Sequence, residues 1–335
     1  MSRAADAGDE VIWQPAASLE RLRLRAQLLS ETRRFFAARG VLEVETPALS
    51  RHAVTDVHLA AGEVAFPGDA ARTLYLHTSP EYAMKRLLAA GSGDIYQICH
   101  VFRGGERGRL HNPEFTLIEW YRIDCPMEAL MTEVAELVIQ LLGTAAHAGE
   151  PLPVEYLSYC ELLEDRTSLD VLTADLPALA RAACGLGCDR QLVARLGRDG
   201  ILDLLMGERV GPTLGHGRLT FVHRYPASQA ALARLDPHDP RVALRFELYL
   251  EGIELANGFA ELGAADEQRA RFEADRRERM RRGQPVPEID EPLLAALAAG
   301  LPECSGVALG FDRLAMIACG AGHLDEVLAF PLERA

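Results

Sequence analysis

Apolar residues recur with helical spacing over 18–39, and this pattern predicts an amphipathic helix. Ser18 is suited to cap the start of this helix, and Gly40 is suited to end it. The next segment, VLEVETPAL, predicts a strand that ends at Pro47. A second helix is predicted over 80–91, because a proline opens that segment and a glycine closes it.

A polar, glycine-rich loop at 104–113 joins two segments with strand character, 94–103 and 113–122. Side chains alternate between the two faces of a strand, so the second segment divides into two sets. The set that is apolar enough to pack against helices is Thr116, Ile118 and Trp120. The mixed set, which either forms a solvated face or carries chemistry, is Phe115, Leu117, Glu119 and Tyr121.

The rest of the chain alternates between long helical stretches and short strands. Residues 127–210 are rich in Ala and Leu and predict helices, and strands return at 218–225 and 241–250. A charged helix is expected at 264–282, and the pattern at 306–320 predicts a strand followed directly by a helix. Together these elements predict an α+β fold, with helices flanking a mostly antiparallel sheet.

Three glutamates and no basic residue occur in the segment FELYLEGIELANGF. Glu247 and Tyr249 share a strand face, Gly252 breaks the register, and Glu254 begins a second run. We interpret Asn257-Gly258 as a turn. Two carboxylates seven residues apart can approach a hard cation such as Mg²⁺ from one side, although solvated surface acids are the alternative.

Two arginines stand where strands end. Arg103 closes its predicted strand, where a guanidinium can make a two-pronged contact with a phosphate or a carboxylate. Arg313 falls in the first turn of a predicted helix, after the spaced glycines Gly306 and Gly310. An arginine near a helix N-terminus suits phosphate, but an ordinary surface arginine remains the alternative for Arg103.

Composition narrows the class of protein. The 335 residues are enough for one large domain with an insertion or for two modest ones, and no apolar run is long enough to span a bilayer. The first residues lack the layout of a secretory signal, so we expect a cytoplasmic protein. The pair Cys184 and Cys188 is weak evidence for zinc, and reduced thiols are expected.

The net charge of −14 argues against a long nucleic acid as the main partner and favours a basic protein partner. The basic run RRERMRR at 276–282 is interpreted as the solvated face of a helix. We therefore expect tRNA to be an unlikely substrate.

Three long motifs resemble, in order and spacing, the catalytic core of class II lysyl-tRNA synthetases: FRGGERGRLHNPEFTLIEWY, FELYLEGIELANGFAEL and GVALGFDRL. The segment around Pro47 looks like the dimer-forming first motif of that family, which implies a homodimer. The resemblance runs from about residue 18 to the end. It implies an N-terminal extension at 1–17 and a catalytic domain at 18–335, with a mainly helical insertion at 143–215.

Only about 18 residues precede the core, so the resemblance implies that the anticodon-binding domain is absent. The whole chain looks like the truncated paralogues that attach a lysine-like amino acid, usually (R)-β-lysine, to a lysine of elongation factor P. Ala308 stands where lysyl-tRNA synthetases usually have glycine. An added methyl group in a tight pocket could favour a substrate whose amine is displaced.

The resemblance implies ATP and Mg²⁺ as cofactors and assigns roles by motif position. Arg103 and Arg313 would be catalytic, and Glu247 and Glu254 would hold Mg²⁺. The residues expected at the nucleotide are Arg103, Gly104, Gly105, Glu106, His111, Asn112, Phe115, Glu247, Leu248, Gly310 and Arg313. Phe115 would stack on adenine, with Arg313 on its other side. The residues expected at the amino acid are Ser79, Pro80, Glu81, Glu119, Tyr121, Glu254, Asn257, Glu261 and Ala308.

The loop departs from the family pattern at one point. Family members have Asn-Glu after the arginine, whereas this chain has Gly104-Gly105 followed by Glu106. Either Glu106 substitutes for the missing glutamate through a shift of the loop, or the affinity for ATP is lower.

The resemblance implies that the amino-acid carboxylate attacks the α-phosphorus of ATP, and that a lysine amine of elongation factor P then attacks the adenylate. Substrate phosphate or a nearby carboxylate would take the proton. The rival interpretations are a minimal lysyl-tRNA synthetase, a ligase of the asparagine-synthetase type, and a catalytically silent regulator.

Overall fold

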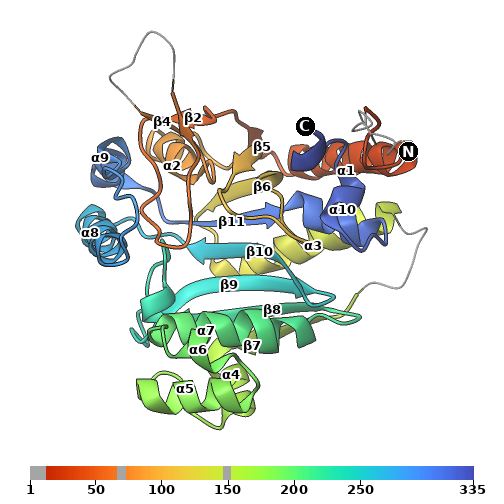
Figure 1. Cartoon of the computed structure of the whole chain (residues 1–335). Coiled ribbons are helices and arrows are strands. Elements are labelled where there is room, and N and C mark those ends of the chain that lie inside the picture. Colours follow the sequence, from red (N-terminus) through yellow and green to blue (C-terminus); the bar gives the residue numbers. More distant parts are fainter. Residues whose placement is uncertain (1–12, 66–72, 146–151) are drawn as a thin grey trace, which may run out of the picture.

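The computed structural model describes residues 13–65, 73–145 and 152–335. Within these residues, eight strands form one sheet in the order β1-β5-β6-β11-β10-β9-β8-β7, with parallel pairs only at its two edges. Its strands are β1 (Leu42–Glu43), β5 (Ile95–Phe102), β6 (Glu114–Ile123), β7 (Val154–Ser158), β8 (Leu219–Pro226), β9 (Val242–Leu250), β10 (Ile253–Ala260) and β11 (Cys304–Gly310). The predicted mostly antiparallel sheet is confirmed (Figure 1).

The helices lie on both faces of this sheet. They are α1 (Leu19–Ala37), α2 (Glu81–Ala89), α3 (Met127–Ala145), α4 (Tyr159–Thr167), α5 (Leu176–Gly185), α6 (Arg190–Val193), α7 (Arg198–Leu205), α8 (Ala265–Arg281), α9 (Glu291–Gly300) and α10 (Phe311–Ala318). As predicted, the Ser18 hydroxyl caps α1 by accepting from the Arg21 N–H at 3.3 Å. Of the helices described, none is both long and apolar enough to cross a membrane.

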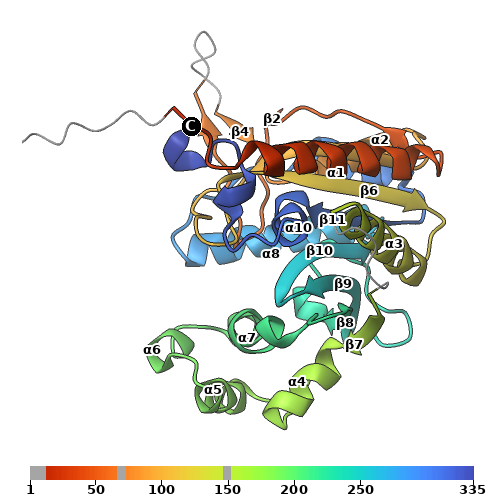
Figure 2. The same cartoon turned by 90° about the vertical axis from the view of Figure 1, so that its right-hand side faces the viewer.

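One face of the sheet carries the main hydrophobic core. Ile118 and Trp120 are fully buried there with residues of α1, α3 and α10, so the predicted division of β6 into two faces is confirmed. The opposite face is covered at its ends, by α2 near β5 and by α4–α7 near β8 (Figure 2). The middle of that face is left open for a cavity.

The segment after α1 is less extended than predicted. Strand β1 is only two residues long, and Pro47 lies between it and β2 (Leu49–Ser50). Proline has no N–H to donate to a ladder, and the chain leaves the large sheet at this point. Strand β2 pairs instead with β4 (Leu74–Leu76), which also pairs with β3 (Glu63–Val64).

The region 143–215 is helical in large part but also contains β7, which the sequence did not predict. This strand forms the edge of the sheet through parallel pairing with β8. A short strand inside an Ala/Leu-rich segment is hard to predict from local sequence, because its pairing partner is distant in the chain. Residues 146–151 of this region lie outside the described residues, as do residues 1–12 of the predicted N-terminal extension.

The predicted Asn-Gly turn is wrong. The chain reverses at Glu251 and Gly252, which have φ values of 50° and 71°, and joins β9 to β10. Asn257 and Gly258 lie inside β10, and a Cβ at Gly258 would come within 2.4 Å of the Phe246 ring. Close packing of two strands therefore requires this glycine, and tertiary structure overrides the local turn preference.

The basic run in α8 is not wholly solvated. Arg279 is only 7% exposed and donates hydrogen bonds to the carbonyl oxygens of Thr55 and Leu59 at 2.8 and 2.6 Å. It therefore fastens loop 54–60 to α8, which the sequence analysis did not predict.

A buried ion pair ties α1 to the start of α10. Asp312, 2% exposed, lies 2.5 Å from Arg25 and accepts the Thr116 backbone N–H of β6 at 2.9 Å. Arg25 also donates to the Thr116 hydroxyl at 2.7 Å. These contacts hold β6 and the helix that carries Arg313 in a fixed relation.

We expect Asp312→Ala to lower the free energy of unfolding by about 3–5 kcal/mol, because it leaves the Arg25 charge buried without a partner. Denaturant unfolding followed by circular dichroism measures this loss. The exposed acid Asp165 is the control, and Asp165→Ala should change stability by less than about 0.5 kcal/mol. Equal losses for the two variants would contradict the interpretation.

Candidate active site

A cavity of about 1240 Å³ opens on the face of the sheet opposite the main core. Most of the predicted site residues line it, namely Ser79, Glu81, Arg103, Glu106, His111, Asn112, Phe115, Glu119, Tyr121, Glu254, Asn257, Glu261, Ala308, Gly310 and Arg313. Motifs that are up to 234 residues apart in the chain, from Ser79 to Arg313, are thus brought together at one place.

Five predicted residues lie outside the lining of the cavity. The Leu248 side chain is fully buried in the main core, so only its backbone could reach a nucleotide, and its predicted place there stays a prediction. Pro80 is buried at the N-terminus of α2. Gly104 and Gly105 are exposed in the loop, and the carboxylate of Glu247 is held by neighbouring side chains.

Strand register explains why residues from three motifs meet on the floor of the cavity. Ala308 of β11 pairs with Glu119 of β6 on one side and with Asn257 of β10 on the other. Asn257 in turn pairs with Glu247 of β9. Directly paired residues of antiparallel strands point to the same face, so these four side chains form one row across the sheet.

A glycine next to this row allows two polar side chains to approach each other. A Cβ at Gly306 would lie 2.3 Å from the Tyr121 ring and 2.5 Å from a carboxylate oxygen of Glu261. Any larger residue would push both side chains away. The small residues of β11 therefore form a trough between the side chains of β6 and β10.

Glu119 is a buried carboxyl at the centre of the trough. It accepts hydrogen bonds from Ser79 and Tyr121, both at 2.7 Å. Burial, together with the nearby Glu81, raises the pKa of Glu119 to about 8, although the two hydrogen bonds act in the opposite direction. A bound cation would therefore stabilise the ionised form of the Glu119 carboxyl.

Lys85 of α2 lies between two more of these acids, and the sequence analysis missed it. Its ammonium is 2.7 Å from Glu81 and 2.6 Å from Glu261, and the side chain is 2% exposed. Burial alone would lower the pKa of Lys85, but the two carboxylates outweigh burial and raise it. Burial likewise raises the pKa of Glu261, to about 7, against the effect of Lys85.

The balance of charge in this part of the cavity is negative. Glu81 and Glu261 contact one permanent cation, Lys85, and Glu119 lies near both of these acids without contacting the lysine. When all three carboxyls are ionised, two negative charges have no internal partner. Like charges that are buried together favour either protonation or a bound cation.

Two arginines and a histidine line the other end of the cavity. The Arg103 guanidinium lies over the Phe115 ring, 5.1 Å from its centre. Arg313 donates to the Glu254 carbonyl at 2.8 Å and lies 2.7 Å from His111 Nε2. Burial and then Arg313 lower the pKa of His111. This end is suited to an anion beside a flat ring.

The two predicted metal ligands differ in their availability. Glu254 lines the cavity, and burial, followed by the charge of Glu247, raises its pKa. Glu247 already binds Arg245 at 2.6 Å and accepts the Tyr249 hydroxyl at 2.7 Å. No group of three or more His, Cys, Asp or Glu side chains in the described part of the chain is arranged to hold a metal ion. Mg²⁺ needs fewer ligands from the protein when phosphate oxygens of a substrate complete its coordination shell. The Glu254 carboxylate, with Glu247 as its neighbour, is therefore compatible with a Mg²⁺ ion that is bound together with a nucleotide.

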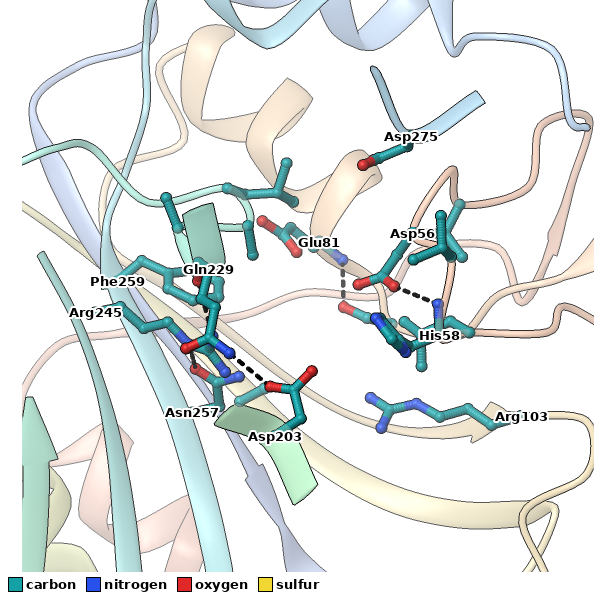
Figure 3. Close-up of a pocket in the computed structure, with 18 of the residues that line it drawn as sticks. Asp56, His58, Glu81, Arg103, Asp203, Gln229, Arg245, Asn257, Phe259 and Asp275 are labelled. Atoms are coloured by element: carbon teal, nitrogen blue, oxygen red, sulfur yellow. Dashed lines mark hydrogen bonds between the residues drawn. The ribbon is translucent and has the colours of Figure 1, made fainter. Parts of the chain in front are cut away.

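Segments outside the predicted motifs also reach this cavity. Figure 3 shows Asp203 on the same side of the cavity as Asn257, and His58 on the same side as Arg103; of these four, Asp203 and His58 come from outside the motifs. Gln229 donates to Asp203 at 2.7 Å, and burial raises the pKa of Asp203 to about 6. Of the missed residues only Lys85 left a local signal, since it stands four residues after Glu81 on a predicted helix.

Comparison with known proteins agrees with this geometry. The family model described as tRNA synthetases class II (D, K and N) matches residues 13–334. Curated proteins named elongation factor P–(R)-β-lysine ligase, from Salmonella paratyphi B and Salmonella dublin, are 51% identical to the chain over 326 residues. The alignment with each covers 96% of this chain and 98% of the relative. The chain therefore belongs to the family of class II tRNA synthetases (D, K and N), in the group of the elongation factor P–(R)-β-lysine ligases.

Proposed function

We propose that the protein uses ATP to activate (R)-β-lysine, or lysine, and transfers it to a lysine side chain of elongation factor P. The names of its relatives support this reaction, and the family supports ATP with Mg²⁺. The observation that carries the proposal is that Glu81, Glu119 and Glu261 line one cavity while only Lys85 offsets their charge, so two ammonium groups can be accommodated.

A diamino acid suits this part of the cavity better than a neutral amino acid does. Its two ammonium groups can replace the protons that burial favours on Glu119 and Glu261. A neutral side chain would leave these groups with the cost of burial and no compensating charge. The acids thus select for the substrate and also select against its neutral analogues.

In the first step, a carboxylate oxygen of the amino acid bonds to the α-phosphorus of ATP, and the bond to pyrophosphate breaks. Arg103 would hold the α-phosphate and the substrate carboxylate, with Arg313 at the phosphate chain and Phe115 under the adenine. These residues orient the reactants and neutralise charge, and no protein nucleophile is required. Bound Mg²⁺, held by Glu254 and Glu247, would neutralise phosphate charge.

In the second step, the neutral ε-amine of the partner's lysine attacks the carbonyl carbon of the adenylate. The bond to AMP breaks, an amide forms, and the amine proton passes to the departing phosphate. Asp203 and His58 line the same cavity (Figure 3), and the lysine side chain of the partner would enter past these two residues. A cytoplasmic location and a homodimer stay predictions.

ATP–pyrophosphate exchange tests the proposal directly. We expect exchange with (R)-β-lysine and lysine but none with norleucine, which lacks the distal amine, and we expect loss of exchange in Arg103→Ala. Labelled amino acid should then appear on elongation factor P and not on tRNA. Label on tRNA would favour a minimal lysyl-tRNA synthetase, and no exchange with any amino acid would favour a silent regulator.

Glu119→Gln should weaken function and increase stability. The pKa of Glu119 is about 8 in the folded protein, above its ordinary value, so its ionisation destabilises the fold as pH rises towards about 8. Glutamine does not ionise. The variant should melt about 2–4 °C above the wild type near about pH 8 and gain less near about pH 5.

The same variant should raise KM for the diamino acid by about tenfold or more, because an ammonium loses its charged partner. Thermal melts at the two pH values and exchange kinetics measure these effects. Glu273→Gln, at an exposed position of α8, is the control. A pH-independent gain, or an unchanged KM, would contradict the role given to Glu119.

Ala308→Gly should change the preference between isomers. The methyl group stands in the row between Glu119 and Asn257, where one carbon is worth about 1–3 kcal/mol of discrimination. The ratio of kcat/KM for (R)-β-lysine to that for lysine should fall by about tenfold, with KM for ATP unchanged. An unchanged ratio would contradict the proposed role of Ala308 in discriminating between the two isomers.

A further inference from the structure

The loop between β5 and β6 sends two successive charged side chains in opposite directions. Gly105 has a φ of 78°, a left-handed conformation that glycine adopts without strain. After this turn Glu106 lines the cavity, whereas the Arg107 guanidinium binds residues near the C-terminus. The Glu106 charge acts to raise the pKa of His111, although burial and Arg313 lower it overall. Glu106 therefore belongs to the arginine-rich end of the cavity.

Arg107 makes a fork with two carboxylates. It donates to Glu333 at 2.7 and 2.5 Å, and to Asp325 at 3.0 and 2.7 Å. Single exposed ion pairs contribute little, but a bidentate arginine in a network of charges is the recognised exception. The side chain of Arg107 is 28% exposed, so solvent competes only in part.

The C-terminal segment also holds the loop at two points after Arg107. The Leu324 N–H donates to the Arg109 carbonyl at 2.9 Å, and the Leu332 N–H donates to the Asn112 side chain at 3.2 Å. The segment is itself fixed to α1 through Glu326, which lies 2.5 Å from Arg21. The fork thus joins the loop to a fixed part of the molecule.

Two adjacent glycines make such a fixed point necessary. Glycine loses more conformational freedom on ordering than any other residue. Without a further anchor, Gly104-Gly105 would therefore let the Glu106 side chain sample many positions. The Gly104 N–H donates to the Ala60 carbonyl at 2.8 Å, which holds the loop before the turn. Arg107 holds it after the turn, with Glu106 between the two anchors.

We propose that Arg107 is a positioning residue, which acts through its fork with Asp325 and Glu333 to hold the Glu106 carboxylate at the nucleotide end of the cavity. The inference rests on the proposed function in taking ATP as the ligand. The Glu106 carboxylate can accept hydrogen bonds from the amine or hydroxyl donors of a nucleoside. The fork contributes to affinity by ordering this acceptor before ATP arrives.

The test measures the Kd for ATP by calorimetry without amino acid, so its outcome does not depend on which amino acid or partner is used. Arg107→Ala should raise Kd by about tenfold, and Arg107→Lys should restore little, because lysine cannot form the fork. The neighbouring Arg109→Ala is the control and should leave Kd unchanged, since among the described residues its side chain makes one hydrogen bond, of 3.5 Å, to the Gly322 carbonyl. A melting temperature close to that of the wild type separates positioning from unfolding.

Glu106→Gln completes the test as a double-mutant cycle. If Arg107 acts through Glu106, each single variant weakens ATP binding and the double variant is no worse than Glu106→Gln alone. Independent, additive losses would overturn the proposal, as would an unchanged Kd in Arg107→Ala. If the wild type binds no ATP, the proposed function fails with it, whereas normal ATP binding without exchange leaves this inference standing.

Discussion

The site depends on one electrostatic constraint, which is that three carboxyls line one cavity while a single lysine behind the lining pairs with two of them. Glu119 and Glu261 have raised pKa values because burial disfavours their charge. Lys85 offsets only part of this effect at Glu261, and hydrogen bonds offset only part of it at Glu119. A fold optimised for stability alone would replace these acids. Their presence between the strands of the sheet is explained by a guest that brings positive charge of its own.

The sheet supplies the rigid support that this arrangement needs. The cross-strand row through Ala308 fixes the spacing of Glu119 and Asn257, and Gly306 lets Tyr121 and Glu261 approach without a clash. The opposite face packs against the main core, so the strands cannot easily relax to relieve the repulsion. The loop with Glu106 and the segments with His58 and Asp203 complete the lining of the cavity.

Local patterns predicted the parts of this molecule that depend on local physics. Helix α1 followed from its spacing and its serine cap, and the two faces of β6 followed from alternation. Tertiary contacts decided the rest: Asn257-Gly258 became strand because of packing against Phe246, and Arg279 was buried by carbonyls of a distant loop. The engagement of Glu261 by Lys85, which are 176 residues apart, required the folded arrangement, although the acid itself was identified from the motifs.

Proton release on substrate binding measures the central constraint most directly. Calorimetric titration of a diamino acid near about pH 7, in buffers of different ionisation enthalpy, counts protons exchanged per molecule bound. Because the ammonium groups displace protons from Glu119 and Glu261, we predict the release of about one proton, and no comparable release with norleucine. Binding of the diamino acid without proton release, or equally tight binding of norleucine, would contradict the account.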